Sequence, residues 1–246
     1  MVSICIDIGN TLTKVGIFEE FHMIYYQVID ADYISVIEPM FESYKIDAVV
    51  LSCVAEVPDQ LVLMIQQKTP AFIILDQNTP IPIENLYNTK DSLGKDRLAA
   101  VIGASSIYPG ENLLVIDAGT AITYDFINNR SHYIGGNISP GIQMRYKALH
   151  SFTKKLPYLN QVQDYDPIGT NTNDAIISGV LQGAVMEMEG MIHYFSKEFE
   201  GLRIVITGGD ASFFDKKLKN TIFVVPNLVL LGLNAVIHYH INHAIL

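Results

Sequence analysis

The chain has 246 residues, a net charge of −10 and an apolar content of 49%. It has no run rich in Lys or Arg, and together with the acidic charge this argues against generic binding to nucleic acid or to an anionic membrane surface. Cys5 and Cys53, its two cysteines, both lie in apolar runs and are expected to be core thiols of a cytoplasmic protein.

Targeting and membrane-spanning segments are not expected either. The N-terminus leads directly into a strand-like run, without the cationic, apolar and cleavage segments of a signal peptide. No stretch approaches the roughly 20 apolar residues of a membrane span. Leu228–Ile237, the most apolar late stretch, is predicted to be a buried helix.

The first half of the chain is predicted to be a mixed α/β unit. Gln77–Leu93 is polar, carries Pro80 and Pro82, and is expected to be a loop. Apolar runs predict strands at Val2–Asp7, Lys14–Phe18, Met23–Val28, Ala48–Ser52 and Phe72–Leu75, and helices are predicted near Tyr33–Tyr44, Pro58–Lys68 and Asp96–Tyr108.

The end of the first strand carries a candidate phosphate site, Asp7-Ile8-Gly9-Asn10-Thr11-Leu12-Thr13-Lys14. Glycine lets a phosphate approach the backbone, Asn and Thr side chains donate hydrogen bonds, and Asp can hold Mg²⁺ directly or through water. Lys14 would lie beside the phosphates as a point charge. Taken alone, the segment is equally well explained by a β-hairpin turn, because Gly-Asn is favourable turn chemistry between two strands.

A second cluster, Gly94-Lys95-Asp96-Arg97, follows the polar loop at the start of a predicted helix. An Asp-Arg pair in this place is often only a helix start. In a nucleotide-binding protein it can also form the acceptor site. Arg97 would then hold a carboxylate bidentately, and Asp96 would take the proton of an attacking hydroxyl.

The second half repeats the plan of the first. Asp117-Ala118-Gly119-Thr120-Ala121-Ile122-Thr123-Tyr124 again follows an apolar run, begins with Asp-x-Gly and has Thr at its seventh position. Strands are predicted at Leu113–Asp117, Ala121–Phe126, His132–Gly136, Arg203–Thr207 and Ile222–Val225, and helices from about Pro140, at Asn173–Phe199, at Ala211–Lys219 and at the C-terminus. Ser151–Asn171 is expected to be rich in loops.

Three antiparallel strands followed by helix, strand, helix and strand, given twice, predict an α/β fold made of a duplicated ribonuclease-H-like unit. Residues 1–110 and 111–246 would be two domains around a nucleotide cleft. A doubly wound nucleotide-binding fold is not supported, because the chain has neither G-x-G-x-x-G nor G-x-x-x-x-G-K-[ST]. Gly135–Gly141 and Thr207–Ala211 are either tight turns or cleft walls at which a ligand meets bare backbone.

Together these motifs resemble the type III pantothenate kinases, a family of the actin-like ATPase superfamily. The resemblance covers nearly the whole chain, and six motifs in the family's order make it specific. They are Asp7-x-Gly-Asn-Thr-x-x-Lys14, Tyr87 followed by Gly94-x-Asp-Arg97, Asp117-x-Gly-Thr-Ala, Gly135-Gly-x-Ile-x-Pro-Gly141, Gly169-x-Asn-Thr172 and Thr207-Gly-Gly.

The resemblance implies phosphorylation of the primary hydroxyl of pantothenate by ATP, the first step of coenzyme A synthesis. By that likeness Asp7 to Lys14 and Thr120 contact ATP, and Asp96 is the catalytic base. Tyr87, Gly94–Arg97 and Thr172 would line the pantothenate pocket. Asp117 would hold a monovalent cation, potassium or ammonium, alongside Mg²⁺.

The family forms dimers whose acceptor pocket is completed across the interface, so the resemblance also implies a homodimer. One local departure is Thr89-Lys90, where relatives often have Pro.

Two other functions are compatible with the scaffold. It occurs in proteins first noted as accessory factors for transcription, so a non-catalytic nucleotide or metabolite sensor is the main alternative. A sensor need not keep Asp96, Arg97 and both Asp-x-Gly motifs, all of which this chain has. Another sugar or acid kinase would share the ATP motifs but lack the acceptor pattern.

Overall fold

The structure is a computed structural model that describes residues 1–9, 11–30, 33–54, 57–160 and 164–245. They form two compact units, each built around one sheet with its own hydrophobic core. Unit 1 consists of Met1–Gly110, Arg130–Ile134 and Asn227–Leu246, and unit 2 consists of Glu111–Asn129 and Gly135–Pro226.

The sheet of unit 1 has the strand order β3-β2-β1-β4-β5. β1 is antiparallel to β2 and parallel to β4, β2 is antiparallel to β3, and β4 is parallel to β5. β1 and β4 are rich in β-branched apolar residues, as suits strands that are covered on both faces. The strands are β1 (Val2–Ile8), β2 (Thr13–Glu19), β3 (His22–Ile29), β4 (Ala48–Cys53) and β5 (Phe72–Ile74).

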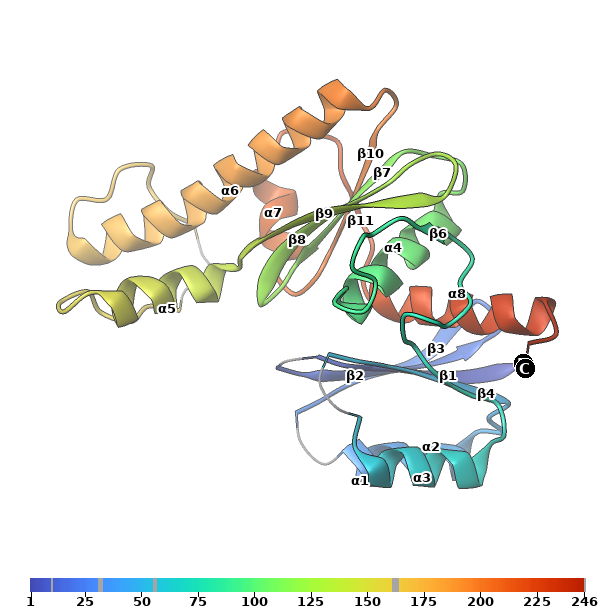
Figure 1. The fold of residues 1–246 in the computed structure, drawn as a ribbon. Helices are drawn as coiled ribbons and strands as arrows, with labels where there is room; N and C mark the ends of the chain where they lie inside the picture. The colour runs from blue at the N-terminus through green and yellow to red at the C-terminus, as the bar shows by residue number, and fades with distance from the viewer. Residues whose placement is uncertain (10, 31–32, 55–56, 161–163, 246) are drawn as a thin grey trace. The chain divides into compact units, whose positions relative to one another are not determined.

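Helices cover both faces of this sheet, three on one face and two on the other (Figure 1). The helix expected near residues 33–44 is two short helices, because Pro39 lacks the N–H that would continue the first. The first face carries α1 (Tyr33–Ile37), α2 (Met40–Ser43) and α3 (Asp59–Lys68), and the second carries α4 (Lys95–Ile107) and α8 (Leu228–Asn242).

The C-terminal helix α8 lies in unit 1, whereas the division expected at residue 110 places it in the second domain. A Cβ on Gly232 of α8 would be 1.8 Å from the carbonyl oxygen of Ala99, so α4 and α8 pack backbone to backbone. Asn234 of α8 accepts a hydrogen bond from Ser3 Oγ at 2.9 Å and donates one to the carbonyl oxygen of Glu20 at 2.8 Å. These contacts, which join the two ends of the chain, fix the helix to the first sheet.

The second sheet has the strand order β11-β10-β7-β8-β9-β6, in which β6 is Glu84–Asn85, and its strands β11 to β9 repeat the plan of the first sheet. β7 is antiparallel to β8 and parallel to β10, and β10 is parallel to β11. The strand order therefore matches that of unit 1, and so do the directions of these three pairings. The strands are β7 (Leu113–Ala118), β8 (Ala121–Ile127), β9 (His132–Pro140), β10 (Arg203–Thr207) and β11 (Phe223–Val224).

β9 extends to Pro140, beyond the predicted end at residue 136, and the next helix starts at Ile142. Glycines lowered the strand propensity of this segment, but Gly136 is required because a Cβ there would be 1.9 Å from the carbonyl oxygen of Tyr124. The first residues of β9 lie in unit 1. There they pair with the two-residue strand β6 (Glu84–Asn85), inside the stretch expected to be a loop.

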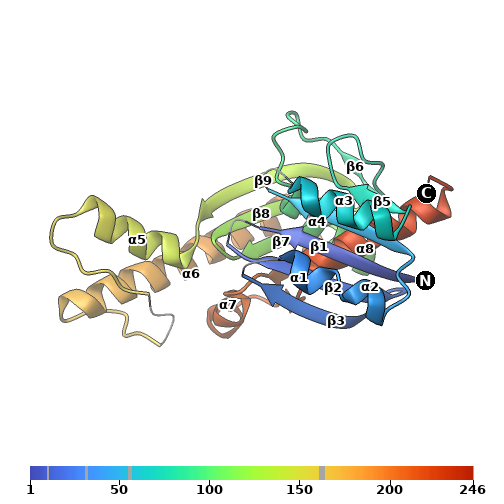
Figure 2. The same cartoon turned by 90° about the horizontal axis from the view of Figure 1, so that it is seen from below.

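In unit 2, α5 (Ile142–Phe152) and α6 (Thr172–Glu198) lie side by side, and α7 (Ala211–Lys217) follows β10 (Figures 1 and 2). By length and composition α6 is apolar enough to cross a membrane, contrary to the expectation that no stretch is. Half of the most apolar 18-residue stretch of α6 is buried, and side chains such as Leu181 and Ile192 belong to the core of unit 2. Burial in this core accounts for its apolar composition.

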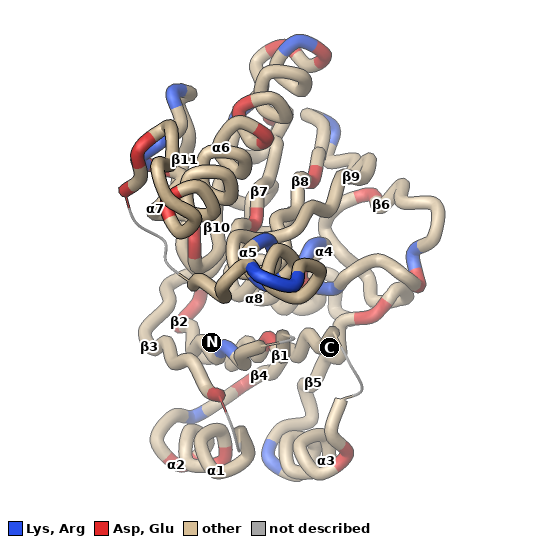
Figure 3. The backbone as a smooth tube through the Cα atoms, turned by 90° about the vertical axis from the view of Figure 1, so that its left-hand side faces the viewer, with Lys and Arg blue, Asp and Glu red and all other residues tan. Residues whose placement is uncertain are grey.

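The charged residues are scattered along the described backbone of both units (Figure 3). α5 and the residues after it carry Lys147, Lys154 and Lys155. Cys5 is buried and Cys53 is half-buried, and burial raises the pKa of Cys5 well above its usual value.

Candidate active site

β1 and β2 form a hairpin around the first Asp-x-Gly motif. In the antiparallel ladder Asp7 pairs with Lys14, and the Gly9 amide closes the turn by donating to the carbonyl oxygen of Leu12 at 3.1 Å. Directly opposite residues of an antiparallel pair point to the same face, so the carboxylate and the ammonium group share one face of the sheet. The hairpin that the sequence allows is therefore present, and it places a cation across from the carboxylate.

The other predicted ATP-contacting residues of this hairpin differ in exposure. Asp7 is only 5% exposed, whereas the turn residues Thr11 and Leu12 are exposed. Ile8 pairs with Thr13, and both are buried. Asn10 lies outside the described residues.

The predicted acceptor cluster assembles in unit 1 at the start of α4. The Cζ atom of the buried Arg97 lies 5.6 Å from the centroid of the Tyr87 ring, and this ring stacks on Tyr133 at 6.1 Å between centroids. Asp96 Oδ1 accepts a hydrogen bond from the Arg97 amide at 2.8 Å. Gly94 precedes the helix, and a Cβ there would be 2.5 Å from the same oxygen. The structure thus brings Tyr87, Asp96 and Arg97 together.

Lys95 and the turn at Thr89-Lys90 flank this cluster. Lys95 is the first residue of α4 and is partly buried. Thr89-Lys90, the departure from the family pattern, begins a hydrogen-bonded turn in which Ser92 Oγ donates to Thr89 Oγ1 at 2.7 Å and the Ser92 amide donates to the Thr89 carbonyl oxygen at 3.1 Å.

β7 and β8 form the second hairpin, in unit 2. Asp117 pairs with Thr123, and the Gly119 amide donates to the carbonyl oxygen of Ala121 at 3.0 Å. This turn is one residue shorter than the first, so a hydroxyl stands opposite the carboxylate where the first hairpin has a lysine. Thr120 is exposed in the turn, and Asp117 is partly buried at the strand end.

Two glycines from distant segments press against the second hairpin. The Gly141 amide donates to the carbonyl oxygen of Thr120 at 3.2 Å, and a Cβ on Gly141 would be 2.3 Å from that oxygen. Gly208 has a φ of +96°, and its Cβ would be 2.3 Å from the carbonyl oxygen of Ala118 and 2.5 Å from Asp117 Oδ1. Both glycines contact the protein's own atoms. At these two positions glycine is therefore explained by tight packing within the fold, and not by a cleft wall that a ligand contacts.

A polar network that the sequence did not reveal holds the segment before Gly141. Arg145 donates from Nε to the carbonyl oxygen of Pro140 at 2.8 Å, and from Nη2 to Ser139 Oγ at 3.0 Å and to Glu187 Oε2 at 2.7 Å. Arg145 and Glu187 are 42 residues apart on different helices, so no spacing rule connects them.

The same network shifts two pKa values. Burial acts to raise the pKa of Glu187, but hydrogen bonds from Arg145 and Ser139 outweigh it and lower that pKa below its usual value. Tyr124 OH donates to Glu187 Oε1 at 3.3 Å, and burial together with the Glu187 charge raises the pKa of Tyr124. The glutamate is therefore held as an anion.

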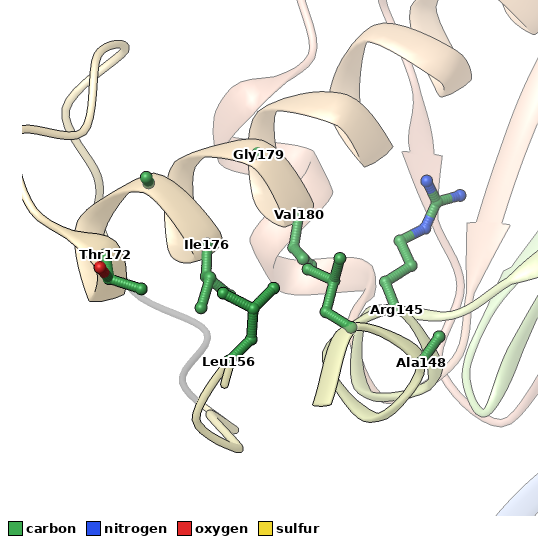
Figure 4. A pocket seen from close by; sticks show the side chains of 9 residues that line it. Arg145, Ala148, Leu156, Thr172, Ile176, Gly179 and Val180 are labelled. Atoms are coloured by element: carbon green, nitrogen blue, oxygen red, sulfur yellow. The ribbon is translucent and has the colours of Figure 1, made fainter. Parts of the chain in front are cut away.

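Thr172 lies in unit 2 on a groove of about 740 Å³ between α5 and α6 (Figure 4). It is the first residue of α6, after Asn171, whose side chain caps the helix by accepting from the Asp174 amide at 3.0 Å. In Figure 4 Thr172 is at one end of the groove and Arg145 at the other. The lining between them is mostly apolar and consists of Ala148, Leu149, Leu156, Ala175, Ile176, Gly179 and Val180.

The oxygen atoms at the second hairpin are suitable ligands for a hard cation. The Asp117 carboxylate and the Thr123 hydroxyl, which are paired in the ladder, are oxygen ligands of the kind that Mg²⁺ and alkali cations take. Among the described residues no three His, Cys, Asp or Glu side chains cluster as a complete metal site. A cation there fits only with phosphate oxygens or water as its remaining ligands, which is the usual arrangement for Mg²⁺ with a nucleotide.

Solved structures of other proteins share the fold of this chain. A crystal structure that carries the name of a Baf family transcriptional activator, from Campylobacter jejuni, has a TM-score of 0.60 and 26% identity, covering 97% of this chain and 99% of that one. The activator of 2-hydroxyisocaproyl-CoA dehydratase from Clostridium difficile, with bound ADPNP, also has a TM-score of 0.60, at 13% identity, covering 99% and 96%. These neighbours and the repeated sheet order confirm the predicted fold, the duplicated ribonuclease-H-like fold of the actin-like ATPases.

Sequence comparison then gives the family. A family model described as type III pantothenate kinase matches residues 3–194. A type III pantothenate kinase from Bacteroides fragilis (strain ATCC 25285) is 38% identical over 97% of this chain and 98% of that protein. Another, from Azobacteroides pseudotrichonymphae, is 39% identical over 96% of each. The chain belongs to the type III pantothenate kinase family, as the resemblance in its motifs predicted.

Proposed function

We propose that this chain transfers the γ-phosphoryl group of ATP to the primary hydroxyl of pantothenate, giving 4'-phosphopantothenate for coenzyme A biosynthesis. The observation that carries the proposal is the cluster of Tyr87, Asp96 and Arg97 at the start of α4, in a chain of this family. A non-catalytic sensor would have no need of this cluster, and relatives that are 35–39% identical bear the name of the kinase. An enzyme is therefore favoured over the sensor.

Two sets of residues would bind the substrates. The ATP set lies on the two hairpins, and consists of Asp7, Ile8, Gly9, Asn10, Thr11, Leu12, Thr13, Lys14 and Thr120. The pantothenate set consists of Tyr87, Gly94, Lys95, Asp96, Arg97 and Thr172. Within it, the buried guanidinium of Arg97 suits the acceptor's carboxylate, since Arg pairs with carboxylates bidentately and the Tyr87 ring limits its movement.

Asp96 would be the base for the attacking hydroxyl. A carboxylate is far too weak a base to form an alkoxide beforehand, so Asp96 would orient the hydroxyl and accept its proton late, as a loose transition state forms. The hydrogen bond from the Arg97 amide to Oδ1 fixes the carboxylate in place for this role. Positioning and charge neutralisation then supply most of the rate enhancement.

Cations would offset the phosphate charge in this acidic protein. Mg²⁺ and a monovalent cation, K⁺ or NH₄⁺, would neutralise negative charge on the nucleotide when bound. Asp117 is proposed to hold the monovalent cation, with the Thr123 hydroxyl opposite it as a further oxygen ligand. Lys14 would supply a fixed positive charge on the first hairpin.

A coupled assay with ATP, Mg²⁺ and K⁺ across a panel of hydroxy acids and sugars tests the proposal. Pantothenate should be the preferred acceptor, and Asp96→Asn should lower turnover by roughly 10²–10⁴-fold without loss of ATP binding. Asp91→Asn, which alters an exposed aspartate in the preceding turn, is the matched control and should be close to wild type. Near wild-type turnover of Asp96→Asn would refute its role as the base.

We further infer a cytoplasmic homodimer in which the acceptor pocket is shared. The mostly apolar groove beside Thr172 supports an interface on α5 and α6. Mixing Asp96→Asn chains with Thr172→Val chains should restore activity above that of either variant, because some mixed dimers regain one intact pocket. No gain, with subunit exchange confirmed, would mean that each pocket is built from one chain.

A further inference from the structure

We propose that Arg145, anchored by Glu187, is a positioning residue for the phosphate-binding turn of the second hairpin. It would set the turn at Gly119-Thr120 through the strap Ser139-Pro140-Gly141, without touching the substrates itself. The inference rests on the proposed function in one respect, which is that Thr120 contacts ATP.

The contacts form a continuous path from α6 to the turn. Glu187 on α6 binds Arg145 Nη2 at 2.7 Å, and Arg145 Nε donates to the carbonyl oxygen of Pro140 at 2.8 Å. The next residue, Gly141, donates its amide to the carbonyl oxygen of Thr120 at 3.2 Å. A Cβ on Gly141 would be 2.3 Å from that oxygen, so the strap cannot shift toward the turn without moving it. All of these residues lie in unit 2.

The guanidinium group is suited to this task in a way that an ammonium group is not. Its planar fork reaches a backbone carbonyl, the Ser139 hydroxyl and a carboxylate at the same time. The anchor is fixed in turn, because Tyr124 OH donates to Glu187 and the Tyr124 side chain is only 1% exposed. Tyr124 lies on β8, the second strand of the same hairpin, so the network contacts the hairpin both at its turn and on β8.

The simpler explanation is that the ion pair only stabilises unit 2. The chain offers a matched control in the same unit. Arg203 pairs with Glu111 through Nε at 2.5 Å and Nη2 at 3.1 Å, with side-chain exposures of 26% and 36%, close to the 20% and 33% of Arg145 and Glu187. Arg203 pairs in the ladder with Leu113, at the opposite end of β7 from Asp117, so its loss would affect stability and not the turn.

The experiment compares Arg145→Met, Glu187→Met, the double variant and Arg203→Met. For the first two, kcat/KM for ATP should fall roughly 10-fold through misplacement of the turn. The double variant should be no worse than either, because one path is broken in each case. Arg145→Lys should recover only part of the loss. Arg203→Met should lower the melting temperature by a similar amount while leaving kcat/KM for ATP unchanged.

Two further measurements keep this test separate from the proposed function. Affinity for a non-hydrolysable ATP analogue, by calorimetry, and amide hydrogen exchange of residues 117–124 should change in Arg145→Met and not in Arg203→Met. If wild type binds the analogue but does not phosphorylate pantothenate, the proposed function fails, and these two readouts still decide the inference. If Arg145→Met does not fold, Glu187→Gln, which keeps the side-chain shape, takes its place.

Unchanged ATP kinetics, analogue affinity and exchange in the folded Arg145 or Glu187 variants would overturn the inference. Losses of the same size in Arg203→Met would also overturn it, since they would show a general effect of stability.

Discussion

The two Asp-x-Gly hairpins share a strand plan and differ in what surrounds the carboxylate. In the first, Asp7 faces Lys14 across the ladder, and the neighbouring strand ends in Ser52 and Cys53. In the second, Asp117 faces Thr123, and the neighbouring strand ends in Thr207 followed by two glycines. The second motif has Tyr124 at the position of Lys14, and because its turn is one residue shorter, the Thr123 hydroxyl faces the carboxylate instead.

The supporting backbone differs as well. In unit 1 the amide of Val54 donates to the carbonyl oxygen of Ile8, and in unit 2 the amide of Asp210 donates to that of Ala118. Counted from the position opposite the accepting residue in the parallel register, the donor in unit 2 lies one residue later in the chain than the donor in unit 1. Gly208 takes up the extra residue with its positive φ. The two copies of the duplicated unit have therefore specialised, because one carries its own cation and the other offers oxygen ligands on a tightly packed turn.

The largest expected difference between the hairpins is in their tolerance of a methyl group. Gly208→Ala should destabilise the protein by about 3 kcal/mol or more, because it strains a positive φ and drives Cβ into Ala118 and Asp117. Gly9→Ala, where Cβ would be 3.0 Å from one carbonyl oxygen, should cost about 1 kcal/mol. Urea unfolding of both variants measures the difference, and equal losses would contradict the tighter packing of the second hairpin.

A second prediction concerns the fixed charge on the first hairpin. Lys14→Met should lower kcat/KM for ATP by roughly 10²-fold, because a positioned donor to the phosphates is lost. Lys68→Met, which breaks only a surface ion pair with Glu38 at 3.8 Å, is the control and should leave the kinetics unchanged. Equal kinetics in the two variants would remove Lys14 from the ATP site.

The missing charge on the second hairpin predicts dependence on a monovalent cation. Rates in K⁺ should exceed rates in Na⁺ at equal ionic strength by about 10-fold, equivalent to about 1.4 kcal/mol in the barrier. Thr123→Lys would place an ammonium group opposite Asp117, as Lys14 lies opposite Asp7, and should bring this ratio closer to one. Equal wild-type rates in both salts would exclude the monovalent cation from the mechanism.

The smallest expected effect is the loss of stability at low pH that follows from protonation of Glu187. The lowered pKa of Glu187 means that its network stabilises the folded protein above the unfolded value of about 4.5, and that this contribution is lost as the pH falls through the folded pKa. Wild type should exceed Glu187→Gln in free energy of unfolding by less than about 1 kcal/mol near pH 7, since the pair is partly exposed. The difference should vanish at low pH. A gap that persists there would mean that the charge is not responsible.

Much of this protein is determined by its sequence alone. β-Branched runs gave the strands, and the position of Asp-x-Gly after each run placed both carboxylates at strand ends. Gly94, Asp96 and Arg97 fall within one helix start, so local order was enough to group them. The motifs also predicted the family correctly, because they occur in a fixed order along nearly the whole chain.

Other features were decided only by tertiary structure. The union of α8 with the first sheet depends on the close approach of Gly232 to Ala99, more than 100 residues away, and the Arg145–Glu187 network joins two helices that share no repeat. The residue opposite each aspartate depends on the register of the hairpin. A difference of one residue in the length of the turn shifts this register by one residue. Strand and helix patterns depend on neighbouring residues, but strand register, backbone contacts and ion pairs between helices depend on how distant segments pack against one another.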